Sequence, residues 1–184
     1  MTRTMSELTL ENILLGLLRE QPRHGYALYK RVEGSPELSR IWHIKRSKLY
    51  YLLERLEEKG YLSSHLERVP SQPDRKMYTI TEEGEQAFAA WVRSPVKSGR
   101  HMRIAFLSRL YFALEEGESL ALELVADQTQ RCRSWKENLE EQLWGMEAPD
   151  FITQQIFRFR IGQVKAMLDW LRECQEEIEQ QHTV

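Results

Sequence analysis

The sequence predicts a mainly α-helical protein that carries a small β-wing in its first half. Apolar residues recur with helical spacing over most of the 184 residues. Two short segments, 61–68 and 76–81, have strand-like composition and flank a Pro-bounded turn. After a polar stretch at 94–100, the apolar spacing is helical again. We therefore expect an N-terminal domain over 1–93, a linker over 94–100 and an all-helical C-terminal domain over 101–184.

Two helices begin the first domain. The first has a single apolar face and ends before Gln21-Pro22, because proline disfavours helical geometry in the residue before it. That face consists of Leu10, Ile13, Leu14, Leu17 and Leu18. The second helix is short, from about Gly25 to Glu33, and we expect Gly34-Ser35-Pro36 to stop it.

The third helix has the most regular apolar face of this domain. Its apolar residues are Leu49, Leu52, Leu53 and Leu56. Gly60 stands where a left-handed C-terminal cap is expected, and Thr81 caps a fourth helix after the two strands. The inward residues of that fourth helix are Phe88, Trp91 and Val92. The order helix, helix, helix, strand, strand, helix predicts a winged helix-turn-helix domain.

The C-terminal domain is predicted to be three helices, near 101–115, 119–144 and 149–180, with the last two forming an antiparallel hairpin. A helix of about 30 residues is ~45 Å long, whereas the first domain should be only ~25 Å across. The hairpin therefore cannot bury both of its faces on its own chain. One apolar stripe of the last helix consists of Ile152, Ile156, Phe159, Met167, Trp170 and Cys174. The other, which we assign to the dimerisation seam of a homodimer, consists of Phe157, Ile161, Val164, Leu168 and Leu171.

Composition is that of an ordinary soluble protein, with 41% apolar residues, 29% charged residues and a net charge of -2. The apolar run Ile13–Leu18 is too short to span a bilayer and lacks a signal-peptide cleavage site. Cys132 and Cys174 form no metal-spaced pair, and on the hairpin they lie too far apart for a disulfide. We expect a cytoplasmic protein with no membrane association, no metal and no cofactor.

Motifs of catalysis are missing from the sequence. There is no Gly-rich phosphate loop, no Gly-x-Ser-x-Gly and no His-Glu-x-x-His, and the five histidines are scattered. We therefore expect that the protein is not an enzyme.

The first turn of the third helix is cationic, with Lys45, Arg46 and Lys48 around Ser47. The outward positions of the helix include Ser47, Lys48, Tyr51 and Arg55, and its later turns carry the acids Glu54, Glu57 and Glu58. Because phosphates repel those acids, such a helix would enter a major groove with its N-terminal end. Ser47 and Lys48 would then meet base edges, and Lys45 and Arg46 the backbone. A solvated helix with a mixed-charge surface explains the same pattern equally well.

The turn between the two strands supplies a second group of cations. Arg75 and Lys76 end the segment that contains Pro70 to Asp74. Long cationic side chains near a hairpin tip can reach phosphates or a minor groove. A charged turn is common by itself, but a cationic helix followed by a basic wing in this order and spacing favours DNA binding.

These residues resemble the PadR family of transcriptional regulators over residues 8–93. The first part of the resemblance is His24-Gly25-Tyr26, Trp42, Leu49-Tyr50, Leu53, Arg55-Leu56-Glu57 and Gly60. The second part is Pro73-Asp74-Arg75-Lys76-Met77-Tyr78-Thr79-Ile80-Thr81-Glu82-Glu83-Gly84 with Trp91. The C-terminal hairpin is similar to the Vir-type domain of the longer family members, in length, helicity and aromatic content.

The resemblance implies a dimeric winged helix-turn-helix repressor that binds double-stranded DNA at a palindromic operator. It also implies release of the DNA by a small aromatic or lipophilic effector in many members. Carried over by motif, the DNA-binding positions are Tyr26, Ser47, Lys48, Tyr50, Arg75 and Lys76, to which charge adds Lys45 and Arg46.

Two positions depart from the family pattern. Lys45 stands where the family commonly has a capping serine, which weakens the expected helix cap by ~1 kcal/mol. Tyr51 stands where the family commonly has proline, and it places an extra aromatic residue near the groove.

Two questions stay open at the level of sequence. Aromatic residues of the second half could line a pocket for a planar effector, or fill the core and the dimer seam. They are Tyr111, Phe112, Trp135, Trp144, Phe157, Phe159 and Trp170. The alternative function is a protein-interaction module, in which the basic surface is incidental and the helical arm docks another protein.

Overall fold

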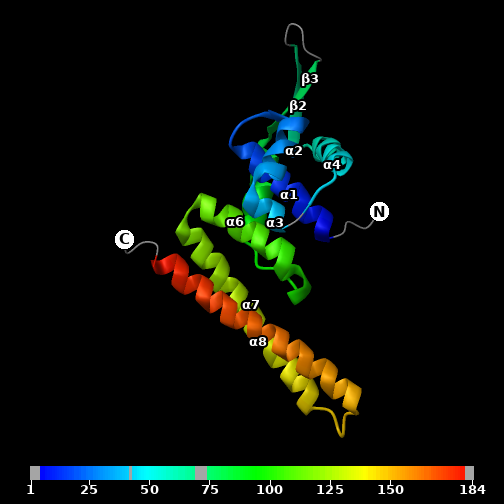
Figure 1. Cartoon of the computed structure of the whole chain (residues 1–184), viewed down its shortest axis with the longest axis vertical. Helices are drawn as coiled ribbons and strands as arrows, with labels where there is room; N and C mark the ends of the chain where they lie inside the picture. The colour runs from blue at the N-terminus through cyan, green and yellow to red at the C-terminus, as the bar shows by residue number, and fades with distance from the viewer. Residues whose placement is uncertain (1–4, 42, 69–73, 181–184) are drawn as a thin grey trace. The chain divides into compact units, whose positions relative to one another are not determined.

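The computed structural model describes residues 5–41, 43–68 and 74–180, and Figure 1 shows the course of the chain. Trp42 and Pro73, which contribute to the family resemblance, lie outside these ranges, as does most of the turn from Pro70 to Asp74. The chain divides into two compact units. The first contains the residues up to Val92 together with Arg103–Phe112, and the second contains Arg93–Met102 and the residues from Ala113 onward.

The first unit is a winged helix-turn-helix domain of mixed α and β structure. Its elements are α1 (Met5–Arg19), β1 (Arg23–His24), α2 (Gly25–Gly34), α3 (Pro36–Ile41), α4 (Arg46–Glu58), β2 (Leu62–Glu67), β3 (Arg75–Ile80) and α5 (Glu82–Val92). The mainly helical fold with a small wing confirms the predicted fold class. The α4 face predicted from leucine spacing is buried, and Leu49, Leu52, Leu53 and Leu56 are each 0% exposed. The predicted α1 face is buried too, except for Leu10, which is half-buried.

The sheet has three strands in the order β1-β3-β2, all antiparallel. Leu62 pairs with Ile80 at one end of the hairpin, and Glu67 pairs with Arg75 at the other. The third strand, β1, was not predicted, because two residues are too few to show an alternating pattern. By pairing Arg23 with Tyr78, it fixes the start of α2 against the base of the wing.

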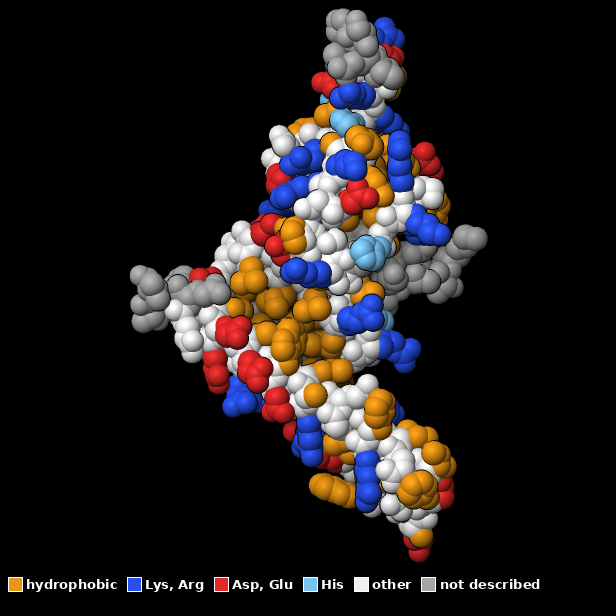
Figure 2. Space-filling view, viewed as in Figure 1, with side chains coloured by type: hydrophobic (Ala, Val, Ile, Leu, Met, Phe, Trp, Pro, Cys, Tyr) orange, Lys and Arg blue, Asp and Glu red, His pale blue; other side chains and the backbone are white. Residues whose placement is uncertain are grey.

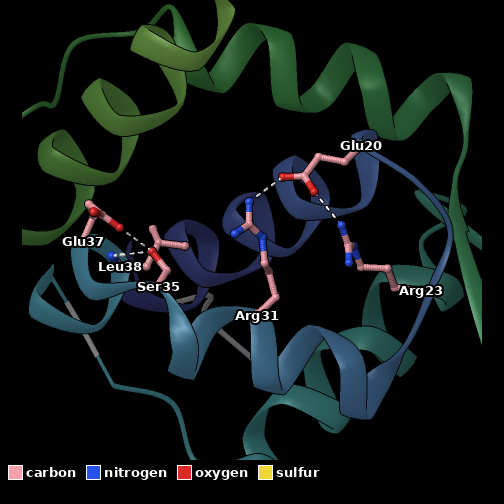
Figure 3. Close-up of polar contacts among 6 residues, drawn as sticks. All are labelled: Glu20, Arg23, Arg31, Ser35, Glu37 and Leu38. Carbon is pink, nitrogen blue, oxygen red and sulfur yellow. Dashed lines mark hydrogen bonds and ion pairs between the residues drawn. The ribbon is translucent and has the colours of Figure 1, made fainter.

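The helix α3 is a second difference from the sequence prediction, which treated Gly34-Ser35-Pro36 only as a stop signal. Pro36 instead begins α3, where a missing backbone N–H costs nothing. The Leu38 N–H donates to the Ser35 hydroxyl oxygen at 3.2 Å, so Ser35 caps the new helix (Figure 3).

Capping of the later helices follows the predictions. Gly60 has a φ of +74° directly after α4, the left-handed conformation that glycine adopts without strain. The Thr81 hydroxyl accepts a hydrogen bond from the Gly84 N–H at 3.2 Å and donates one to the Gly60 carbonyl at 2.7 Å. Lys45 occupies the N-cap position of α4 and makes no side-chain capping bond, as the departure from the family pattern implied.

Residues 99–116 form a 3₁₀ turn (Gly99–His101), a π-helical segment (Met102–Phe106) and α6 (Leu107–Glu116). The prediction placed this stretch in the C-terminal domain, but Arg103–Phe112 belongs to the first unit. The aromatic rings explain the difference, since Phe112 packs edge-on to Phe88 with 5.4 Å between ring centroids.

The second unit is dominated by α7 (Glu118–Trp144) and α8 (Phe151–Gln180), which lie side by side as the predicted antiparallel hairpin (Figure 1). Part of the predicted linker is bound to this hairpin. The buried Val96 N–H donates to the Gln128 side-chain oxygen at 2.7 Å. Both cysteines are free thiols.

The hairpin uses the apolar stripe that the sequence assigned to the dimer seam. Phe157, Ile161, Val164 and Leu171 are buried within the single chain, and Leu168 is half-buried. These five residues therefore lie largely buried within one chain rather than on its exposed surface. The apolar side chains left exposed are instead Trp144, Met146, Phe151, Ile152, Ile156 and Phe159, at the end of the hairpin where α7 turns into α8 (Figure 2).

Among the residues that the structure describes, no helix is both long and apolar enough to cross a membrane.

Candidate nucleic-acid interface

An ion-pair network connects the end of α1 to β1 and α2 (Figure 3). The Glu20 carboxylate accepts a hydrogen bond from Arg23 at 2.5 Å and another from Arg31 at 3.0 Å. Although burial raises the pKa of Glu20, the two arginines outweigh it, and the net shift is downward. Glu20 thus stays ionised at neutral pH and links the end of α1 to the helix that presents Tyr26.

The first turn of α4 presents the cations that the sequence singled out. Lys45, Arg46 and Ser47 are exposed, and Lys48 is half-buried with its Nζ 4.4 Å from the centroid of the Tyr51 ring. Tyr51 itself is exposed, so the extra aromatic ring lies against the Lys48 ammonium rather than in the core.

Arg46 lies between two tyrosine rings from different helices. Its guanidinium carbon is 5.4 Å from the Tyr26 ring centroid and 5.9 Å from that of Tyr50. Tyr26 is 46% exposed, whereas Tyr50 is half-buried beside Gly25. A β carbon at Gly25 would lie 2.5 Å from the Tyr50 ring, so only glycine allows this approach of the two helices.

A cleft of about 710 Å³ lies beside this arginine. Its lining comes from the start of α2, from α4 and from the base of the wing, as His24, Gly25, Tyr26, Ala27, Lys30, Arg46, Tyr50, Asp74, Arg75, Lys76 and Tyr78. Five of the eight predicted DNA-binding residues therefore meet at one place. Lys45, Ser47 and Lys48 are not among the lining residues, although Lys45 is the N-cap before Arg46 and the other two follow it in the first turn of α4. Lys and Arg side chains gather over this part of the unit (Figure 2).

The wing is tied to α4 through Lys76. The Lys76 ammonium donates to the Glu57 carboxylate at 2.6 Å, and the Ser64 hydroxyl donates to the other oxygen of the same carboxylate. The hydrogen bond from Lys76, followed by that from Ser64, holds the pKa of Glu57 below its usual range. The same interaction raises the pKa of Lys76. The sequence placed Lys76 near DNA and Glu57 among the later-turn acids that phosphates repel, and it did not predict the contact between them.

Arg55 differs from its predicted outward position. Its Nε lies 3.3 Å from a carboxylate oxygen of Glu11, which is 0% exposed, and the Lys59 ammonium lies 2.7 Å from the same oxygen. This buried acid anchors the C-terminal half of α4 to α1. Arg55 therefore supports the helix instead of facing a groove.

Six of the eleven lining residues were not predicted as site residues, and His24, Lys30 and Tyr78 are three of them. His24 caps α2, because its Nδ1 accepts a hydrogen bond from the Ala27 N–H at 3.2 Å. Lys30 extends over the Tyr26 ring and pairs with Glu33 at 2.7 Å. Burial raises the pKa of Tyr78, so that its phenol stays neutral at the rim of the wing. The His24-Gly25-Tyr26 triplet was the signal for the first of them.

No group of three or more metal-ligating side chains occurs in the ranges 5–41, 43–68 and 74–180. The cleft has no acidic cluster, and its chemistry is that of cations and phenols arranged for an anion. A winged helix with this surface belongs to the class of DNA-binding regulators.

Comparison with known proteins narrows the class to a family. A model described as "Transcriptional regulator PadR-like family" matches residues 14–90. The chain belongs to this family of DNA-binding transcriptional regulators.

Individual relatives match over different lengths. The "Negative transcriptional regulator PadR" of Bacillus subtilis is 25% identical over 171 residues, which are 88% of this chain and 93% of the relative. An uncharacterised protein of Lysinibacillus sphaericus is 30% identical over 84 residues, 46% of this chain and 75% of that protein.

Among solved structures, Bacillus subtilis PadR in complex with operator DNA is 24% identical, with 92% of this chain and 98% of that chain covered and a TM-score of 0.46. The same protein in complex with p-coumaric acid is 23% identical, with 96% and 99% covered and a TM-score of 0.41.

Proposed function

We propose that the protein is a homodimeric repressor that binds a palindromic operator through the first turn of α4 and the wing. The observation that carries this proposal is the meeting of Tyr26, Arg46 and Lys76, from α2, α4 and β3, around one cleft next to the start of α4. Support for repression comes from the Bacillus subtilis relative, which is described as a negative regulator and matches 88% of the chain.

The proposed roles divide along the surface. Ser47 and Lys48 are exposed or half-exposed at the tip of α4 and would meet base edges in the major groove. Lys45 at the N-cap and Arg75 in the wing would contact backbone phosphates on either side. The acids Glu54 and Glu58 lie in later turns, which fits a helix that inserts its N-terminal end only.

A second copy of the chain would cover the exposed apolar end of the hairpin. Phe151 and Phe159 are 75% and 67% exposed, and Ile152 and Ile156 lie on the same helix one turn apart. Residues 152, 156 and 159 follow the spacing of a helix–helix seam. We propose this stripe, in place of the buried one, as the two-fold interface.

For a small effector, we propose a cleft of about 640 Å³ inside the second unit. Its walls combine a half-buried tryptophan, Trp135, with the cations Lys97, Arg100 and Arg160 and the apolar Met167. A flat aromatic face beside cations suits a planar aromatic or lipophilic molecule that carries an acid group. The other predicted aromatic residues are used differently: Phe112 and Phe157 are core residues, and Trp144 and Phe159 are exposed.

The experiment that tests the proposed function is selection of bound sequences from a random pool of duplexes. Enrichment of a palindrome with half-sites about one helical turn apart is the expected result. Absence of any enriched sequence would favour the alternative, a protein-interaction module on a winged-helix scaffold. An enriched site without symmetry would contradict the homodimer while keeping DNA binding.

A further inference from the structure

The Arg46 guanidinium is held by π faces and not by an acid. The rings of Tyr26 and Tyr50 lie 5.4 and 5.9 Å from its carbon. Among the described residues, Arg46 forms no ion pair with a carboxylate. The neighbouring cations differ, because Lys30 pairs with Glu33 and Lys76 pairs with Glu57.

A guanidinium above an aromatic ring keeps its N–H donors for another partner. The attraction arises from the ring quadrupole and uses the face of the cation, while the donors point outward from its edge. The planar edge of arginine matches two oxygens of a phosphate. A cation that the protein already holds in place loses less conformational entropy when it binds.

The Tyr50 ring is itself held against the backbone of α2, and Tyr26 comes from the same helix. Tyr50 fits against Gly25, where a β carbon would lie 2.5 Å from Cε1 and 3.0 Å from Cζ of the ring. Tyr26 lies one residue further along α2 and carries Lys30 at 6.0 Å on its face. Gly25, Tyr26 and Tyr50 therefore act on the position of Arg46, although the sequence pattern had assigned the tyrosines as direct DNA contacts.

The remaining polar groups of the cleft are compatible with one anion. His24 uses Nδ1 to accept the Ala27 N–H, so its neutral ring carries hydrogen on Nε2, which is a donor. Asp74 is the one carboxylate among the lining residues, and it faces Arg68 at 3.6 Å.

Resting on the proposed function, we propose that Arg46 binds one backbone phosphate of the duplex in this cleft. Tyr26 and Tyr50 are the residues that position Arg46, and Gly25 makes room for the Tyr50 ring. Arg46 thereby makes a phosphate contact that does not depend on the DNA sequence, in contrast to Ser47 and Lys48 in the same turn. It adds affinity and orientation, and it leaves discrimination between bases to its neighbours.

The test compares a selected duplex with a random duplex of equal length, using the full-length chain from about 50 to 200 mM KCl. Arg46→Gln should lower the slope of log K against log salt by about 0.9 for each phosphate that the variant no longer neutralises. Affinity should fall about tenfold for both duplexes, with the ratio between them unchanged. Arg131→Gln, an exposed arginine of α7, is the matched control and should leave the slope as in wild type.

A double-mutant cycle tests whether Tyr26 positions Arg46. Tyr26→Phe keeps the ring and should retain affinity, whereas Tyr26→Leu should weaken binding nearly as much as Arg46→Gln does. In the Arg46→Gln background, Tyr26→Leu should have no further effect. Tyr26 is 46% exposed, so thermal melting should show the Leu variant folded like wild type. Independent effects of the two substitutions in the cycle would overturn the positioning role.

Three outcomes separate the possible failures. An unchanged salt slope in Arg46→Gln overturns the phosphate anchor, and a reduced ratio between selected and random duplex shows base reading instead. A wild-type chain that binds no duplex overturns the proposed function itself. An unchanged salt slope in Arg46→Gln, together with a rise in melting temperature by inorganic phosphate that this variant lacks and that chloride at equal ionic strength does not give, would assign the cleft to the free ion and overturn the DNA assignment.

Discussion

The ammonium of Lys76 on β3 lies 2.6 Å from the carboxylate of Glu57 on α4, nineteen positions earlier in the chain. This ion pair joins the wing to the helix that carries Ser47 and Lys48. It also means that a cation proposed to contact DNA already has an acidic partner in the free protein. DNA binding therefore has to compete with Glu57 for Lys76, or share it.

Glu57→Gln should strengthen duplex binding several-fold at low salt. The substitution removes a negative charge near the phosphates and releases Lys76, while the amide can still accept from Ser64. Fluorescence anisotropy with a labelled duplex measures the effect, and Glu83→Gln on α5 serves as a control of equal charge change. Weaker binding by a folded Glu57→Gln variant would mean that the ion pair positions the wing for DNA.

Lys76→Ala should weaken duplex binding without unfolding the chain. The side chain is partly exposed and its ion pair is partly screened by solvent, so little stability is expected to depend on it. Circular dichroism checks the fold, and anisotropy checks the affinity. Equal affinities of Lys76→Ala and wild type would remove Lys76 from the DNA-binding surface.

The stabilisation that the Lys76–Glu57 ion pair gives the folded protein should be lost at low pH. Because the folded-state pKa of Glu57 is depressed, its stabilising contribution is complete above the ordinary glutamate pKa of about 4.3 and is lost as pH falls through the lower folded value. The melting temperature of wild type should exceed that of Glu57→Gln near neutral pH. That difference should shrink as pH falls below the ordinary value and should vanish once pH is below the lowered folded-state pKa of Glu57. A difference that grows on acidification would reverse the predicted sign.

Because Glu11 is buried, removing both of its cationic partners at once should lower the free energy of unfolding strongly. Arg55→Ala with Lys59→Ala leaves a fully buried carboxylate without these two partners, for which a loss of about 3–5 kcal/mol is typical. Urea denaturation measures the free energy of unfolding. As a control, Arg93→Ala breaks an exposed pair with Glu123 and should cost less than about 1 kcal/mol. Similar losses in both variants would contradict the buried anchor.

Phe159→Glu should dissociate the proposed dimer while leaving each protomer folded, because Phe159 is 67% exposed on the single chain. Ile161→Glu, two residues away and buried, should instead destabilise the hairpin. Sedimentation and thermal melting distinguish the two effects, with the exposed Lys165→Glu as a control on α8. A Phe159→Glu chain that remains dimeric would move the interface away from this stripe.

Local patterns predicted the helices and the wing because their signals lie within a few residues. The leucine spacing of α4, the Gly60 cap and the Thr81 cap all act over one or two turns. The helix α3 was missed because Pro36 serves equally as a stop signal and as a first helical residue. Strand β1 was missed because its pairing with β3 is non-local.

The candidate site could be predicted only in part for the same reason. The sequence indicated Arg46, Tyr26 and Tyr50 but not their contact, since the rings come from separate helices. It placed Arg55 outward because Glu11, its partner, lies far away in the chain. Both stripes of α8 are apolar, so composition alone could not decide which one α7 would cover.

DNA binding through the first turn of α4 is best tested by the affinity of the full-length chain for its selected duplex between about 50 and 200 mM KCl. Wild type and Lys48→Ala are compared, because Lys48 lies in that turn. We predict sub-micromolar binding, below about -8 kcal/mol in free energy, that weakens steeply with salt and falls in Lys48→Ala. Binding that is indifferent to salt, or equal in the two proteins, would contradict this assignment.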